Sequence, residues 1–139
     1  MENTGKINNR DLVQITDFSQ LLFPTYRGHN ISPTDVDLCL EWQGRLCVIG
    51  ELKWGDNDIN VGQEITFTNV VNALNKGGYG NGAMVVVANH QNKPNDDIMA
   101  GDAIVRKVYR NGKWHSFQHK NISLTTFFEL LLFQFGIMK

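Results

Sequence analysis

Apolar and polar positions repeat with two different periods along the chain, and the change of period separates helices from strands. From Asn9 to Phe23 the apolar residues recur at helical spacing and Pro24 ends the run, which predicts a first helix. Thr34–Trp42 and Arg45–Trp54 instead alternate apolar and polar residues on either side of Gln43-Gly44. This second pattern predicts two strands joined as a β-hairpin.

The remainder of the chain continues to alternate helix and strand signals. The run Ala83–Asn89 is continuously apolar, as expected for a strand that is buried on both faces. The other expected elements are a helix over Asn60–Lys76, a hairpin of Ala103–Arg110 with Lys113–His119, and a final helix over Ser123–Phe135. The pattern predicts an α/β fold with a mixed central sheet, in one domain covering residues 1–139.

The first predicted hairpin carries polar side chains where a buried strand favours apolar ones. Glu51 and Lys53 are two residues apart in a strand and therefore point to the same side. Asp37 joins that side if the hairpin pairs it with Glu51, which requires a loop of odd length or a bulge around Gly44. The same register predicts two further pairs, Cys39 with Ile49 and Glu41 with Cys47.

Two carboxylates in such a position favour a bound cation. At a separation of about 4 Å they repel by roughly 4 kcal/mol in an environment of effective dielectric near 20. Oxygen ligands favour Mg²⁺ or Mn²⁺, so we expect Asp37, Glu51 and the Leu52 carbonyl to bind the metal. Lys53 would steady the charge that develops on a phosphate or orient the attacking water. Asp35 is the alternative ligand if the register slips.

Charge is distributed unevenly, although the formal net charge is only -1. Residues 35–64 contain seven acidic residues against two basic ones, whereas residues 104–121 contain five basic residues and no acidic one. An acidic cluster beside a basic flank suits an enzyme that holds cations next to a phosphate backbone. We therefore expect DNA as the partner, contacted by Arg106, Lys107, Arg110 and Lys113, with Trp114 and His115 as further contacts. A solvated hairpin face is the alternative interpretation of this basic stretch.

The string of Asp37, thirteen intervening residues and Glu51-Leu52-Lys53 resembles the motif of the PD-(D/E)xK nucleases. That family includes Holliday-junction resolvases and many restriction endonucleases. The resemblance covers roughly residues 9–90 and implies a restriction-endonuclease-like αβββαβ core, with the segment around Arg27–Ile31 as its first strand. It also implies a Mg²⁺-dependent deoxyribonuclease. Gln63 matches a glutamine that some members carry in the following helix, which makes it a further catalytic candidate.

Other functions remain open at this point. The chain would also suit a non-catalytic nucleic-acid- or partner-binding protein on a nuclease-like scaffold, or a plain interaction domain. Glu51 and Lys53 would then form a solvated face, Asp37 would start a turn, and Gln63 would be a solvated helix residue. The final helix is more apolar than one core-facing stripe requires, which suggests a homodimer formed through it.

The remaining features narrow the class of protein. Cys39 and Cys47 lie in apolar stretches and are expected to be reduced core residues, since their spacing is not that of a zinc site. Apolar residues make up 42% and charged residues 19%, which is ordinary for a folded domain and unlike a disordered one. The first residues lack the pattern of a signal peptide, and no apolar run approaches the length of a membrane span, so a cytoplasmic protein is expected.

Overall fold

The computed structural model describes residues 17–139. The structure divides into two compact units with a boundary between Thr34 and Asp35. The second unit, residues 35–139, is a mixed α/β fold with a five-stranded sheet and two α-helices. All the residues singled out as site candidates belong to this second unit.

In the first unit, strand β1 (Phe23–Pro24) pairs antiparallel with β2 (Asn30–Ile31). The predicted helix over Asn9–Phe23 is therefore wrong for residues 17–23, and its earlier part lies outside the described residues. Two local effects explain the difference. The Asp17 carboxylate accepts a hydrogen bond from the backbone N–H of Ser19, which competes with helix formation, and a residue before proline favours extended backbone.

The segment around Arg27–Ile31, which was expected to supply the first core strand, also differs from the prediction. Asn30–Ile31 pairs within the two-stranded sheet and is not a member of the five-stranded one, so that prediction was wrong. A local turn accounts for this pairing. The N–H of Thr25 donates to the carbonyl of His29 at 2.7 Å, and Gly28 adopts a φ of 79°. The turn folds the chain back on itself before it reaches the larger sheet.

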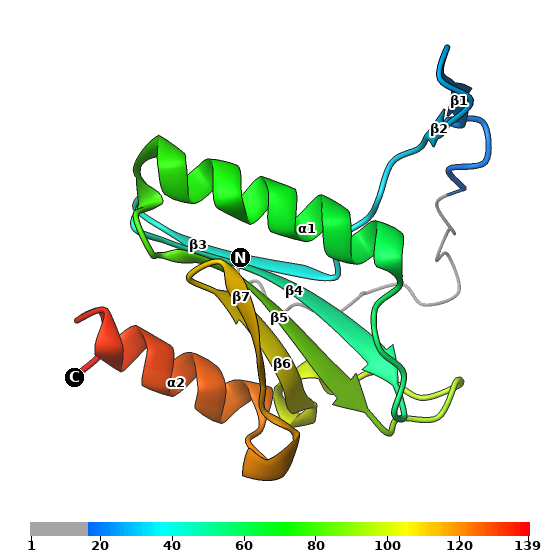
Figure 1. Cartoon of the computed structure of the whole chain (residues 1–139). Coiled ribbons are helices and arrows are strands. Elements are labelled where there is room, and N and C mark those ends of the chain that lie inside the picture. Colours follow the sequence, from blue (N-terminus) through cyan, green and yellow to red (C-terminus); the bar gives the residue numbers. More distant parts are fainter. Residues whose placement is uncertain (1–16) are drawn as a thin grey trace, which may run out of the picture. The chain divides into compact units, whose positions relative to one another are not determined.

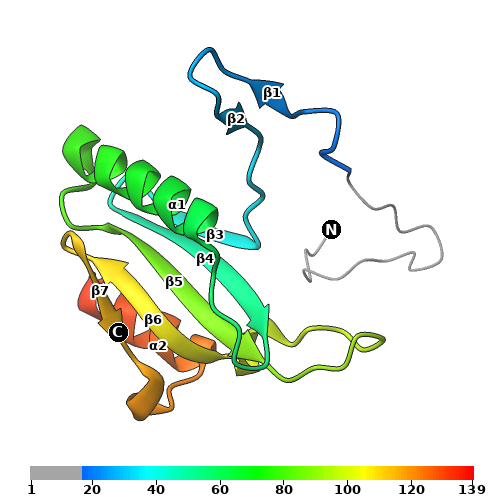
Figure 2. The ribbon, with the colours of Figure 1, turned by 45° about the vertical axis from the view of Figure 1, so that its right-hand side comes forward.

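The five-stranded sheet has the strand order β3-β4-β5-β6-β7 (Figure 2). Its strands are β3 (Leu38–Trp42), β4 (Leu46–Trp54), β5 (Ala83–His90), β6 (Ile104–Arg110) and β7 (Lys113–Ser116). The helical segments are α1 (Val61–Leu74), α2 (Leu124–Gln134) and the short η2 (Asn75–Tyr79), η3 (Ala100–Asp102) and η4 (Gln118–Lys120). Strands β4 and β5 are parallel and are connected through α1, while the other neighbours are antiparallel. The mixed sheet is thus as predicted.

The predicted register of the β3–β4 hairpin is confirmed. Cys39 pairs with Ile49 and Glu41 with Cys47. Three residues separate the last pair, Trp42 and Leu46, so the loop has the expected odd length. Two of the loop residues, Gln43 and Gly44, have positive φ angles of 48° and 68°. The glycine adopts this conformation at little cost, which helps to fix the register that brings the start of β3 beside Glu51.

Two apolar layers cover the two faces of the sheet, with α1 on one side and α2 on the other (Figure 1). Alternation along β4 sends Leu46 and Val48 into the α2 layer, and Cys47 and Ile49 into the α1 layer. Strand β5 is central and buried on both faces, as its apolar run predicted. Glu51 continues the alternation of Cys47 and Ile49, so its side chain lies on the side of α1.

The two cysteines differ in their surroundings. Cys47 is buried, whereas Cys39 is exposed, so the prediction that both are core residues was wrong for Cys39. Both are free thiols with their Sγ atoms 3.9 Å apart. Burial, and then the neighbouring Cys39, raise the pKa of the Cys47 thiol to about 11. No helix within residues 17–139 has the length and apolar character that crossing a bilayer requires.

Candidate active site

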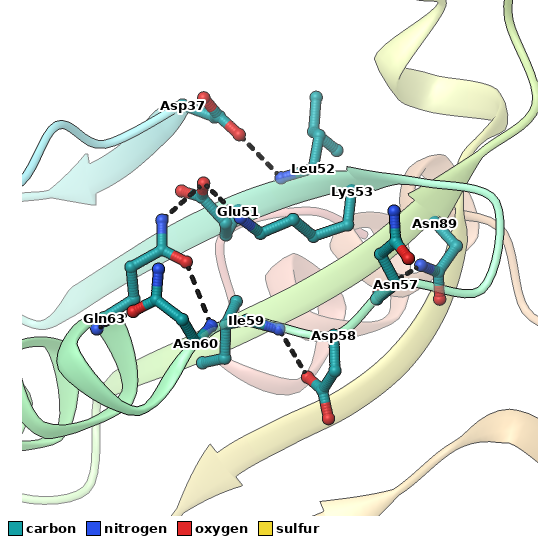
Figure 3. A network of polar contacts seen from close by, with 10 residues as sticks. All are labelled: Asp37, Glu51, Leu52, Lys53, Asn57, Asp58, Ile59, Asn60, Gln63 and Asn89. Carbon is teal, nitrogen blue, oxygen red and sulfur yellow. Dashed lines mark hydrogen bonds and ion pairs between the residues drawn. The ribbon is translucent and has the colours of Figure 1, made fainter.

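Asp37 lies immediately before β3 and is fixed to the neighbouring strand. Its Oδ2 accepts a hydrogen bond of 2.8 Å from the backbone N–H of Leu52 on β4 (Figure 3). This bond explains why β3 begins at Leu38 rather than at Thr34, because a side chain takes the partner that a strand backbone would have used. The bond holds the Asp37 carboxylate next to the residue that follows Glu51.

Glu51 is a buried carboxylate, with only 5% of its surface exposed. Its Oε1 accepts a hydrogen bond of 3.0 Å from Nε2 of Gln63 and forms an ion pair of 3.7 Å with Nζ of Lys53. Its Oε2 is also buried and has no hydrogen-bond partner in the described part of the chain. A buried carboxylate oxygen without a partner is costly, and such groups in folded proteins commonly mark a bound ion or water.

The surroundings of Glu51 oppose its ionisation. Burial raises the pKa of this carboxyl above its ordinary value of 4.5, and the negative charge of Asp37 raises it further. Lys53 and the hydrogen bond from Gln63 act in the opposite direction, and Asp35 adds a smaller increase. The net shift is upward, so the native protein without a bound cation holds an acid that resists losing its proton.

Gln63 is held at both ends of its amide. In addition to the bond to Glu51, the side-chain Oε1 of Gln63 accepts a hydrogen bond of 3.3 Å from the backbone N–H of Asn60. The backbone N–H of Gln63 donates in turn to Oδ1 of Asn60 at 2.8 Å. Asn60 and Gln63 thus form a capping box at the start of α1. The sequence analysis did not assign a role to Asn60, although the spacing Asn-x-x-Gln before a helix is the pattern that would have revealed it.

The loop between β4 and α1 is fastened to β5 and β6. Oδ2 of Asp58 lies 3.1 Å from Nζ of Lys107 and 3.6 Å from Nε of Arg106. Arg106 also donates to the carbonyl of Asp56, and Asn89 donates to the carbonyl of Asn57. These contacts fix the backbone that leads into Asn60 and the capping box. This role of Asp58 was also missed, because it depends on contacts with residues about fifty positions further along the chain.

Several charges compete at Asp58. Burial opposes ionisation, but the hydrogen bond from the N–H of Ile59 and the charges of Lys107 and Arg106 outweigh it, so the pKa of Asp58 is lowered. Asp58 is consequently an anion at neutral pH and is paired with two cations.

The four basic residues predicted to contact DNA do not gather on one surface. Arg106 and Lys107 are engaged with Asp58 near α1, and Lys107 also lies 4.4 Å from the centre of the Trp114 ring. Arg110 contacts α2 instead, where it donates to Gln134 and lies over a phenylalanine ring. The fourth residue, Lys113, is exposed at the start of β7.

The oxygen ligands predicted for a metal lie together, but they form a small set. Within residues 17–139 no group of three or more His, Cys, Asp and Glu side chains is arranged to hold a metal ion. What the structure offers is Asp37 and Glu51 on adjacent segments, joined through the backbone of Leu52. Two carboxylates, one of which has a buried oxygen without a partner, and the nearby carbonyl of Leu52 fit a hard divalent cation that completes its coordination with water or substrate oxygens. Asp35 is exposed, and its effect on Glu51 is smaller than that of Asp37.

Neither the family models, nor the curated proteins, nor the solved structures with which the chain was compared give a match.

Proposed function

We propose that the chain is a deoxyribonuclease of PD-(D/E)xK type that depends on Mg²⁺ or Mn²⁺. The observation that carries the proposal is the buried Oε2 of Glu51, which has no partner among the described residues although it lies in a cluster with Asp37 and Lys53. A carboxylate that served only to stabilise the fold would be expected to have both oxygens hydrogen-bonded.

Each residue has a role that follows from its contacts. Asp37, Glu51 and the Leu52 carbonyl would hold the cation, which when bound supplies charge neutralisation and promotes ionisation of the attacking water. Gln63 occupies Oε1 of Glu51 and thereby leaves Oε2 for the cation. The ammonium group of Lys53, beside Oε1, stabilises negative charge on the phosphate or orients the water.

The order of elements supports the same family. A β-hairpin, a helix and a parallel strand follow one another as β3, β4, α1 and β5, with the acidic residues where β3 begins and towards the end of β4. This order is compatible with the later part of a restriction-endonuclease-like core. Within the described residues the larger sheet receives no strand from before residue 35, so the proposal rests on the site more than on the complete core.

A second candidate function is binding to DNA or to another partner without catalysis. It is favoured by the small ligand set, since only two carboxylates in the described residues meet at the site. It is also favoured by the ion pair between Lys53 and Glu51, because a lysine and a glutamate can neutralise each other without any metal.

Titration calorimetry with Mn²⁺ tests the metal site. We expect wild type to bind one ion, and we expect both Asp37→Asn and Glu51→Gln to lose at least about tenfold in affinity, since each removes a charged ligand. Asp96→Asn, in an exposed loop, serves as the matched control and should bind Mn²⁺ like wild type. Equal affinity in wild type and Glu51→Gln would contradict the assignment.

We also propose that the protein forms a homodimer through α2. Leu124, Phe127 and Leu131 of this helix pack on the sheet, whereas Leu130 and Phe133 remain 59% and 66% exposed. A second copy of the same helix would cover these side chains. Sedimentation should give twice the mass of the chain, and Phe133→Ser should give a monomer; a wild-type monomer at micromolar concentration would refute the dimer.

A further inference from the structure

A cavity of about 750 Å³ lies between the β6–β7 hairpin, η4 and α2. Met84, Val108 and Phe127 of the α2-side apolar layer form part of its wall. Glu51 faces α1 on the other side of the sheet, so the cavity is separate from the candidate active site. Its volume falls within the range of small-molecule sites in proteins.

Positive charge dominates the cavity wall. Arg110 and Lys120 supply this charge, His115 and His119 also line the wall, and none of the described residues that line it is Asp or Glu. A concave surface with one sign of charge concentrates ions of the opposite sign. The wall therefore favours an anionic ligand.

The Arg110 guanidinium lacks a carboxylate partner within the described residues. Nη1 donates to the neutral amide oxygen of Gln134 at 3.3 Å, and the group lies 5.7 Å from the centre of the Phe135 ring. Its Nε is buried and has no hydrogen-bond partner. A partly buried guanidinium with unused donors is well suited to phosphate oxygens, which it binds with two parallel hydrogen bonds.

Aromatic side chains complete the wall. Phe117 and Phe127 line the cavity with their ring centres 6.1 Å apart, and Nζ of Lys120 lies 4.7 Å from the centre of the Phe117 ring. A planar base would find stacking partners here at a short distance from the cations, whereas an inorganic anion would leave the aromatic surface unused.

We propose that this cavity binds a phosphate group attached to a nucleoside, with the phosphate at Arg110 and Lys120 and the base against the aromatic rings. A free nucleoside monophosphate and the phosphorylated end of a nucleic-acid strand present this same chemistry. The inference does not depend on the nuclease proposal, because the cavity and Glu51 lie on opposite faces of the sheet.

Calorimetry on the full chain tests the proposal with four probes: adenosine monophosphate, adenosine, and a short single strand with either a 5′-phosphate or a 5′-hydroxyl. We expect adenosine and the 5′-hydroxyl strand to bind at least about tenfold more weakly than their phosphorylated counterparts, as loss of a charged hydrogen-bond partner predicts. Tight binding of the monophosphate alone identifies a free nucleotide as the ligand, and tight binding of the phosphorylated strand alone identifies a strand end.

Variants connect the binding to the cavity. Arg110→Gln and Lys120→Gln should each weaken binding of the phosphorylated probe by about tenfold or more. Lys93→Gln, an exposed lysine in the loop after β5, makes the same change of charge elsewhere and should leave binding unaltered. Lys120 is exposed, so Lys120→Gln gives the answer if Arg110→Gln fails to fold. Absence of binding by wild type, equal affinity for adenosine and its monophosphate, or an unchanged affinity in Lys120→Gln would overturn the proposal.

Discussion

Gln63 on α1 donates a hydrogen bond of 3.0 Å from its Nε2 to Oε1 of Glu51 on β4. The bond joins the first turn of a helix to a buried carboxylate on the sheet. The same amide closes the capping box with Asn60, so the start of the helix and the ionisation of Glu51 depend on one side chain.

Gln63→Ala should move the pKa of Glu51 further upward. The hydrogen bond from Gln63 lowers this pKa in the native protein, and its loss leaves burial and Asp37 less opposed. Titration of the Glu51 carboxyl by NMR in the metal-free protein would measure the shift. Thr66→Ala changes an exposed position on the same helix and should leave the titration as it is in wild type. An unchanged Glu51 titration in Gln63→Ala would show that the bond has no electrostatic importance.

Asn60→Ala should destabilise the fold by about 1 kcal/mol, because it removes the side-chain acceptor at the start of α1. The Glu51 titration should stay close to that of wild type, because the backbone N–H of residue 60, which holds the side-chain amide of Gln63, is retained in this variant. Asn60→Ser retains a capping oxygen and should recover most of the stability in urea unfolding. A loss of stability that Asn60→Ser does not recover would mean that Asn60 acts through something other than the cap.

Glu51 should make the metal-free protein less stable as the pH rises. Its pKa in the folded state is raised above the ordinary value of 4.5, so the native state holds the proton over a pH range in which the unfolded chain has released it. The destabilisation of the native state by Glu51 is absent below the unfolded pKa. It grows as pH rises from there through the raised native pKa, and it is complete above the native pKa. Glu51→Gln removes the titration.

The free energy of unfolding of Glu51→Gln minus that of wild type should therefore become more positive as pH rises from 4.5. Saturating Mn²⁺ should stabilise wild type and reduce this difference, because the ion binds the native carboxylate. A difference that becomes more negative with rising pH would contradict the raised pKa.

Asp58→Asn should loosen the loop that leads into α1. The pKa of Asp58 is lowered in the native protein, so its contribution to stability is present above the unfolded pKa and is lost as pH falls through the lower native pKa. Because the side chain is 39% exposed, the loss at neutral pH should be below about 1 kcal/mol. The difference in the free energy of unfolding between wild type and Asp58→Asn should disappear on acidification. Asp96→Asn should show no such difference at any pH.

The parts of the fold that the sequence predicted are those governed by local pattern. Alternation along two strands and a glycine in their loop were sufficient to predict which residues face each other across the β3–β4 hairpin. Likewise, the continuous apolar run of β5 was sufficient to predict a strand buried on both faces. The error over residues 17–23 arose because helical spacing of apolar residues took precedence over the effect of Pro24 on the residue before it.

The sequence predicted which residues form the candidate site, but it did not predict all the contacts that hold the site in place. Asp37, Glu51, Lys53 and Gln63 are brought together as expected. The pairing of Asp58 with Lys107 joins positions far apart in the sequence, and no periodicity signals it. A basic stretch gives the charges but not their partners, so the ion pairs of Arg106 and Lys107 with Asp58 could not be predicted from it.

Cleavage of DNA tests the proposed nuclease most directly. Supercoiled plasmid and a branched duplex would each be incubated with wild type, Lys53→Ala and Lys93→Ala, in Mg²⁺ and in excess chelator. We predict cleavage by wild type and Lys93→Ala in Mg²⁺, no cleavage in chelator, and a rate about 100-fold to 1000-fold lower for Lys53→Ala, as expected when a group that stabilises developing charge is removed. If wild type and Lys53→Ala both leave every substrate intact in Mg²⁺ while still binding DNA, the protein is a binding module and the nuclease assignment is wrong.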